Sequence, residues 1–300
     1  MASFTIPPSK LIFVRQTDPP PQSIVQRQAS DCLQLKYHGG ATIQDLTYQP
    51  VFLGEAWQST LLRGLSNQLT TSLKTAMQSS ELNEVFKQYF DKNAVSATPL
   101  DAKFYLYVGA GGNADIRWKP YFYGEDIERT VAFLHGQGAL PPDLNNSAVL
   151  LLLAPGTILF KRNDPFGGAA SIGFLDSMGG LASYHSFVDL DGGGRVYYAV
   201  SVWSDGENGA AVPGWQPWES TCAGVYHELA ETRTNPNIEG ETPDKQWGWA
   251  SCEGEEIGDL SLDWAGDDPS LVFRKDLPNL KGIPIELLWS NADKKPYVPP

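Results

Sequence analysis

Cysteine is scarce in this chain of 300 residues, which contains only Cys32, Cys222 and Cys252. Three cysteines allow at most one internal disulfide, so a scaffold held together by several disulfides is excluded. Their spacing also matches no zinc-finger pattern. The fold must therefore depend on a hydrophobic core, and 42% of the residues are hydrophobic.

Long apolar runs and positive charge are also lacking. The longest apolar run, Ala148–Ala154, has the length of a strand and falls far short of the ~20 residues that a membrane helix needs. The chain has 22 lysines and arginines against 35 aspartates and glutamates, a net charge of −13. Nucleic acids and anionic membranes are negative as well, so neither is an expected partner of this acidic protein.

The N-terminus shows no signal peptide, because no basic region precedes a run of ~7–15 apolar residues. We therefore expect an intracellular protein, unless the chain is a processed form of a secreted one. Residues 1–35 are rich in proline and glutamine and are expected to form an arm. Residues 36–300 contain no internal repeat and no clear linker, so we expect them to form one domain.

Helical and strand patterns alternate along this domain, followed by a hairpin signal at the glycine-rich residues 191–194. Pro50 favours an edge position for the first strand. The order of the patterns predicts an α/β (α+β) fold, a zincin-like layered domain with a mixed sheet, an active-site helix and an irregular C-terminal part. Helices are expected at Trp57–Gln78, Glu81–Phe90, Glu125–Gly136, Trp218–Thr234 and Glu255–Leu262, and strands at Thr47–Gly54, Lys103–Val108, Ala148–Leu153, Leu181–Leu190, Arg195–Trp203 and Pro284–Trp289.

The most specific chemical pattern is the HExxE motif of residues 227–231. On a helix, His227 and Glu231 lie one turn apart on the same face, so both can bind one metal ion. Glu228 lies about 100° around the helix, where it could take a proton from a metal-bound water. The motif is that of the H-E-x-x-H metalloprotease helix with glutamate replacing the second histidine. The alternative is an amphipathic surface helix with two solvated glutamates.

A catalytic zinc site needs a third protein ligand. The acidic segment Glu253–Leu260 follows the motif at a suitable separation, about 25 residues past Glu231. We expect Glu256 to be the third ligand, with Glu255 as the alternative. The competing interpretation is that this acidic run is solvated surface.

Two further residues are expected near the metal. Asp259 could hold His227 through its second ring nitrogen, as metal-bound histidine usually requires. His185, on the preceding hairpin, is a rival ligand. If the acidic segment packs on the HExxE helix, Cys222 and Cys252 should also be neighbours, and a disulfide would need Cα atoms ~4.4–6.8 Å apart.

Four tryptophans flank the HExxE helix in loop-like sequence. Aromatic residues in loops can line a substrate cleft or stack on sugar rings, so these four are candidate cleft residues. The simpler interpretation, which we favour, is that they cover the helix as core. They are Trp215, Trp218, Trp247 and Trp249.

Taken together, these motifs resemble the exordium/phosphate-induced-protein-1 family of plants and its microbial relatives. Plant members are secreted, are linked to the cell wall and growth, and have no settled catalytic activity, so the resemblance implies the metal-like constellation without implying an enzyme. This chain departs from the family in its lack of a signal peptide, its few cysteines and Ser261, where the family often has cysteine. The shared segments, in family order, are Tyr37–Gly40, Tyr184–Ser186, His227–Glu231 with Thr234–Pro236, and Glu256–Leu260.

Two functions follow as expectations. The first is a zinc-dependent hydrolase, a metallopeptidase acting on a peptide or polysaccharide, in which His227, Glu231 and Glu256 hold Zn²⁺ and Glu228 is the general base. The second is a non-catalytic, carbohydrate-binding protein with a structural HExxE helix. An open coordination position and a cleft at Glu228 would favour the enzyme. A buried salt bridge at Glu228 would favour the binding protein.

Overall fold

The computed structural model describes residues 33–90, 95–105, 121–161, 176–237 and 247–300. The expected N-terminal arm lies almost wholly outside these ranges. Leu35, at the end of that arm, is buried in the core and donates its backbone N–H to Asn291 Oδ1 at 2.9 Å. Among the described helices, none combines the length and the apolar character needed to cross a membrane.

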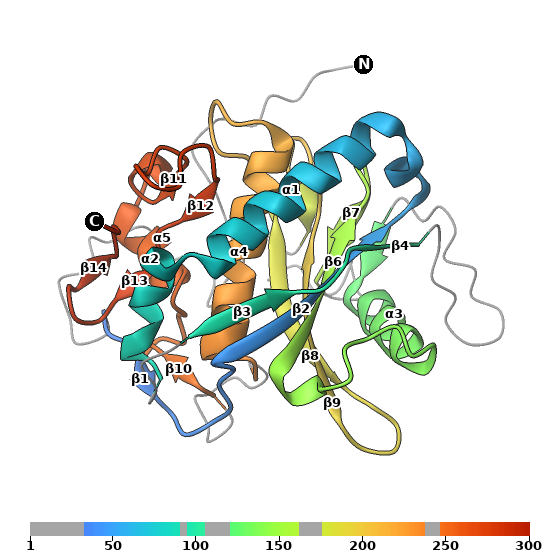
Figure 1. Ribbon diagram of the computed structural model, residues 1–300, viewed down its shortest axis with the longest axis horizontal. Coiled ribbons are helices and arrows are strands. Elements are labelled where there is room, and N and C mark those ends of the chain that lie inside the picture. The colour runs from blue at the N-terminus through green and yellow to red at the C-terminus, as the bar shows by residue number, and fades with distance from the viewer. Residues whose placement is uncertain (1–32, 91–94, 106–120, 162–175, 238–246) are drawn as a thin grey trace, which may run out of the picture.

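A mixed six-stranded sheet forms the centre of the described domain (Figure 1). Its order is β3-β2-β6-β9-β8, and β4 pairs with β2 on the same side as β3. All pairings are parallel except that of β8 with β9 at the edge. This confirms the expected α/β class and mixed sheet. The strands are β2 (Asp45–Leu53), β3 (Ser96–Pro99), β4 (Lys103–Tyr105), β6 (Ser147–Leu153), β8 (Ser183–Asp189) and β9 (Arg195–Ser201).

Helices cover both faces of this sheet. Helices α1 (Thr60–Gln78) and α4 (Pro217–Thr234) contact each other on one face, and α3 (Gly124–Gly136) packs on the other (Figure 1). The central strand β6 is buried along its whole length because both of its faces are covered, which explains its unbroken apolar sequence. Along the edge strand β8, successive side chains alternate between the faces, so Ser183 and His185 share the α4 side with the core residue Phe187.

Helix α4 begins and ends at residues suited to those positions. Pro217 occupies its first turn, where a missing backbone N–H costs nothing, and Gln216 and Glu219 form a reciprocal cap. The helix stops at Asn235, since a residue followed by proline avoids the helical region. The structure thus confirms the helix expected over residues 218–234 almost to the residue.

The remaining elements are short. A C-terminal group of hairpins contacts α4 through β12. The short elements are β1 (Lys36–Tyr37), α2 (Ser80–Asn83), β5 (Tyr121–Tyr123), β7 (Ile158–Phe160), β10 (Trp249–Ala250), α5 (Asp259–Ala265), β11 (Phe273–Arg274), β12 (Ile285–Glu286), β13 (Trp289–Ser290) and β14 (Lys295–Pro296), with 3₁₀ turns at Glu55–Gln58, Glu84–Gln88, Leu144–Asn146, Ser177–Gly179 and Pro269–Leu271.

The edge position inferred from Pro50 is wrong, because β2 is an interior strand. The partners on one side of β2 change along its length. Strand β3 pairs with Asp45–Tyr48 and β4 pairs with Val51–Leu53. Pro50 lies between these two ladders, at a position where the missing N–H of proline breaks no hydrogen bond to β3 or β4. At the same position, Gln49 Nε2 donates to the carbonyl of Asp101.

Several boundaries also differ from the expected ones. The first long helix starts at Thr60, after a 3₁₀ turn, because Ser59 caps it by accepting the N–H of Leu62. The helix expected at Glu81–Phe90 is one turn of α-helix followed by a 3₁₀ turn. Strand β4 is described only to Tyr105, and the end of the expected strand at Val108 lies outside the described residues. The short helix expected from Glu255 starts at Asp259 instead.

Helix α4 is buried on all sides although it is rich in polar residues. Arg233, with no exposed surface, holds its C-terminal end. Its guanidinium donates to Asn83 Oδ1 and to the carbonyl of Gln44, both at 2.8 Å, and to the carbonyl of Ser96 at 3.3 Å. It also lies 4.2 Å above the ring of Phe86. One buried cation therefore connects α4 to α2 and to the segments that flank the sheet.

We predict that Arg233→Met lowers the free energy of unfolding by about 3 kcal/mol, because the buried Asn83 Oδ1 and two partly buried carbonyls lose their donor. Denaturant unfolding followed by circular dichroism measures the change. Arg129→Met is the matched control. Arg129 is half-exposed and pairs with nearby acids of α3, so its loss should change the stability by less than about 1 kcal/mol. Equal effects of the two substitutions would contradict the role given to Arg233.

Candidate metal centre

The HExxE residues lie in the protein interior. His227, Glu228 and Glu231 are 1%, 3% and 3% exposed, so the alternative of a solvated surface helix is excluded. The acidic segment is also turned inward at Glu255, Glu256 and Asp259, while Glu253 is exposed. Burial of carboxylates on this scale is costly unless partners or ions compensate them, so their contacts decide what the site can do.

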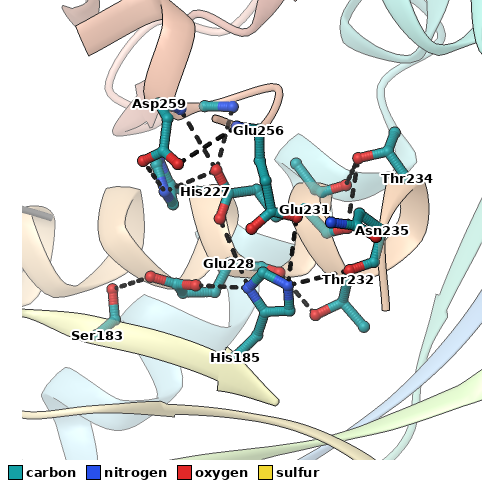
Figure 2. Close-up of polar contacts among 12 residues, drawn as sticks. Ser183, His185, His227, Glu228, Glu231, Thr232, Thr234, Asn235, Glu256 and Asp259 are labelled. Atoms are coloured by element: carbon teal, nitrogen blue, oxygen red, sulfur yellow. Dashed lines mark hydrogen bonds and ion pairs between the residues drawn. The ribbon is translucent and has the colours of Figure 1, made fainter. Parts of the chain in front are cut away.

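His227 lies between three carboxylates. Its Nε2 is 3.1 Å from Glu231 Oε1 and 3.9 Å from Asp259 Oδ1 (Figure 2). Its Nδ1 is 2.9 Å from Glu286 Oε2, on β12. The Glu231 oxygen also accepts the backbone N–H groups of Gly258 and Asp259 at 3.3 Å each. The second ring nitrogen of His227 is thus occupied by Glu286, and not by Asp259 as the sequence predicted.

His185 has a similar environment on the sheet side of α4. Its Nδ1 is 3.0 Å from Glu228 Oε2 and 3.5 Å from Glu231 Oε2, and its Nε2 is 3.6 Å from Glu256 Oε1 (Figure 2). The same Nε2 is 3.2 Å from the carbonyl of Asn235, the residue that ends α4. Strand β8 supplies this histidine because its alternation turns His185 toward the helix.

In the part of the chain that the structure describes, two groups of side chains could each hold a metal ion. One consists of His227, Glu231 and Asp259, and the other of His185, Glu231 and Glu256. In each group the ligand atoms lie within 4.8 Å of one another, and every residue is buried. Both groups contain Glu231.

This grouping differs from the expected set of His227, Glu231 and Glu256. Glu256 faces His185, and Asp259 faces the ring nitrogen of His227 that also faces Glu231. The cause is local, because α5 starts at Asp259 and Glu256 lies three residues before it, where the N–H of Glu256 donates to Asp259 Oδ2 at 3.3 Å. Glu255 is buried but belongs to neither group.

Both oxygens of Glu228 are engaged. Oε1 accepts the hydroxyl of Ser183 at 2.8 Å, and Oε2 lies 3.0 Å from His185 Nδ1. This is the buried pair that, among the expectations from sequence, favours a binding protein over an enzyme.

Sequence reasoning missed Glu286. The sequence pattern predicts only a strand over residues 284–289 and gives no role to Glu286, which is fully buried there. A signal was present, because a single glutamate within the apolar run of residues 283–289 needs a buried partner if the strand is buried. The structure shows that this partner is His227.

Burial and neighbouring charges shift the pKa values of the cluster in different directions. Burial would lower the pKa of His227, but the carboxylates of Glu231 and Glu286 outweigh it and hold that pKa well above its usual value. Burial would raise the pKa of Glu231, but the nearby imidazoles outweigh burial and hold that pKa below its usual value. Burial raises the pKa of Glu286 to about 7 despite His227. Burial and the charges of Glu231 and Asp259 raise the pKa of Glu256 well above its usual value.

The cluster has more carboxylates than cationic partners. Within the described part of the chain, no lysine or arginine pairs with Glu228, Glu231, Glu256 or Glu286. One oxygen each of Glu256 and Glu286 is buried and has no hydrogen-bond partner among the described residues. Unpaired carboxylate oxygens next to imidazole nitrogens are the donor set that suits a divalent cation such as zinc.

The backbone of the acidic segment lies directly against His227. A Cβ atom added to Gly258 would be 2.2 Å from His227 Nδ1, which is far closer than any real contact. Only glycine fits at this position. This close approach allows the N–H of Gly258 to reach Glu231.

The flanking tryptophans differ in exposure. Trp218 and Trp247 are buried, at 7% and 2% exposed, and Trp215 and Trp249 are partly buried. Trp249 lies with its ring centroid 5.3 Å from that of Tyr89, and Trp215 lies 6.1 Å from Phe273. These contacts fit the interpretation that the tryptophans cover the structure around α4.

Two surface hollows of the described domain contain no site residue. One is lined by residues of the α1–α2 junction with Asn279 and Leu280, and the other by residues of α1 with Pro50 and residues 99–102.

Cys222 is a free, buried thiol, whereas Cys252 is disulfide-bonded, so these two cysteines do not form a disulfide with each other.

Comparison of the chain with protein-family models and with curated proteins gives no match. The resemblance to the exordium/phosphate-induced-protein-1 family therefore stays a prediction from the quoted motifs, and the functional argument rests on the geometry of the cluster.

We predict that Gly258→Ala destabilises the protein by about 1–3 kcal/mol, the usual cost of overpacking, because the new methyl group must displace His227. Thermal unfolding by calorimetry measures the loss. Gly64→Ala is the control. Gly64 lies within α1 with open space at its Cβ, so alanine should raise stability by up to about 1 kcal/mol. A neutral Gly258→Ala would mean that the segment does not press on His227.

Proposed function

We propose that this chain is a zinc-binding protein whose zinc ion stabilises a zincin-like layered domain. The observation that carries the proposal is the buried excess of carboxylates at α4, which lie beside two histidines. Among the described residues, no lysine or arginine pairs with Glu228, Glu231, Glu256 or Glu286. An uncompensated buried charge costs several kcal/mol, so such a cluster must take up protons or a cation.

His227, Glu231 and Asp259 would hold the ion. Glu286 fixes the ring of His227 through Nδ1 and leaves Nε2 directed at Glu231 and Asp259. A carboxylate on the second nitrogen is the usual arrangement for a metal-bound histidine. Imidazole and carboxylate ligands suit zinc, which when bound supplies the positive charge that these side chains lack.

The consequence for the fold is a connection between three distant parts of the chain. His227 and Glu231 come from α4, Asp259 opens α5, and Glu286 comes from β12. An ion bound by the first three residues would hold the irregular C-terminal part against the helix. Because such ligands are assembled only in the folded state, zinc binding would add directly to stability.

We predict that the protein purified without chelator contains zinc and that His227→Ala loses the ion held by His227, Glu231 and Asp259. Elemental analysis measures the content. Removing zinc from the wild type should lower its unfolding temperature, since a ligand at 100 times its Kd stabilises by about 2.7 kcal/mol. His135→Ala, at an exposed position on α3, should leave both quantities unchanged. No bound transition metal in the wild type, even after soaking in zinc, would contradict the proposal.

A second candidate function is a zinc-dependent hydrolase, most simply a peptidase. The pair of His185 and Glu228 beside Glu231 favours it, because a glutamate backed by a histidine can receive and hold a proton. Zinc, when bound, would polarise a carbonyl and acidify a water. Glu228 Oε2 would accept the proton from this water, and His185 Nδ1 would hold the Glu228 side chain in position through its contact with Oε2. The burial of Glu228 and its two hydrogen bonds place this function second.

Replacing Glu228 by glutamine tests the hydrolase directly, because the change keeps the size of the side chain and removes the proton acceptor. A general base predicts that peptide cleavage falls by a factor of ~10²–10⁴ with stability near that of the wild type. A digest of a peptide library by the wild type and Glu228→Gln measures it. Cleavage by neither protein, or equal cleavage by both, would rule out this mechanism.

A further inference from the structure

We infer that the cluster holds a second divalent metal ion, bound by His185, Glu231 and Glu256, with Glu231 shared between the two sites. The inference rests on the proposed zinc site and extends it. It makes the centre a pair of ions at one carboxylate, in place of the single ion expected from the sequence.

The first observation is that the two histidines have matching surroundings. Each ring has its Nδ1 against a buried glutamate that belongs to no ligand group, His227 against Glu286 at 2.9 Å and His185 against Glu228 at 3.0 Å. Each also has its Nε2 facing a carboxylate of its own group. The carboxylate–histidine pairing that orients a metal ligand is therefore present twice.

Glu231 is placed to serve both groups. Its Oε1 lies 3.1 Å from His227 Nε2, and its Oε2 lies 3.5 Å from His185 Nδ1 (Figure 2). In each group Glu231 offers an oxygen within 4.8 Å of the ligand atoms of the other two residues. The two oxygens thus face different histidines. A carboxylate that presents one oxygen to each of two sites is the natural bridge between two cations.

A second, independent observation points to the ion. Glu256 is 3% exposed, and its Oε1 has no hydrogen-bond partner among the described residues although it lies 3.6 Å from His185 Nε2. The spacing is too long for a hydrogen bond. A metal ion between this oxygen and His185 Nε2 would give the oxygen a partner, and it would replace the 3.2 Å contact of Nε2 with the carbonyl of Asn235.

The charge of the cluster points the same way. Five buried carboxylates surround two imidazoles, and one divalent cation leaves most of their negative charge uncompensated. The carboxylates are those of Glu228, Glu231, Glu256, Asp259 and Glu286. Two divalent cations would nearly neutralise it. The second ion therefore removes a desolvation cost that the first ion cannot remove alone.

The inference gives Glu228 a positioning role. It would orient His185 as Glu286 orients His227, and it would contact no ion or substrate itself. Loss of such an orienting carboxylate typically weakens metal binding 10–100-fold. A general base at this position would leave metal binding unchanged, so the two roles are separable by experiment.

The test is the zinc stoichiometry of the full-length chain. Dialysis against a chelator strips the metal from the protein, and a second dialysis removes the chelator. Zinc chloride is then titrated into the protein in a calorimeter. Elemental analysis after gel filtration counts the retained zinc. We expect two zinc ions in the wild type and one in His185→Gln. Glu228→Gln should keep the first binding event and weaken the second 10–100-fold, whereas Glu207→Gln, at an exposed position, should match the wild type.

The outcomes separate the two proposals. One zinc in the wild type, or two in His185→Gln, would overturn the second site and leave the first standing. No zinc in the wild type would overturn both. Circular dichroism identifies any variant that fails to fold, and in that case the wild-type count alone decides the inference.

Discussion

Burial of the HExxE helix is the constraint on which the rest of the structure depends. Helix α4 lies between the sheet, α1 and the C-terminal hairpins, and it carries Glu228 and Glu231 into the interior. The surroundings must compensate those charges. The sheet contributes His185, and the acidic segment contributes the backbone N–H of Gly258. The fold around α4 is thus organised by electrostatic compensation as much as by apolar packing.

The irregular C-terminal part has a role in this scheme. It contains few long elements, yet it brings Glu256, Asp259 and Glu286 to one place. Gly258 allows the segment to lie against the His227 ring, where any side chain would clash. The absence of regular structure is therefore compatible with a well-defined cluster, because polar contacts and close packing fix the backbone there.

Sequence patterns predicted the α/β class and the mixed sheet of this domain correctly. The continuous apolar run of β6 and the proline after α4 both express local rules, and both elements were predicted correctly. Contacts between distant segments were harder. Nothing in the local sequence distinguishes Glu256 from Asp259 as the neighbour of His227, since the choice depends on where α5 starts. The interior position of Pro50 depends on a gap between two partner strands that its own segment does not encode.

The central claim is that a metal ion compensates the buried carboxylates of α4. The most direct test is a crystal structure of protein purified without chelator, with diffraction data collected on both sides of the zinc absorption edge. The account predicts an anomalous peak about 2.0–2.2 Å from His227 Nε2 and from an oxygen of Glu231. A well-ordered cluster without such a peak, held by hydrogen bonds between protonated side chains alone, would contradict it.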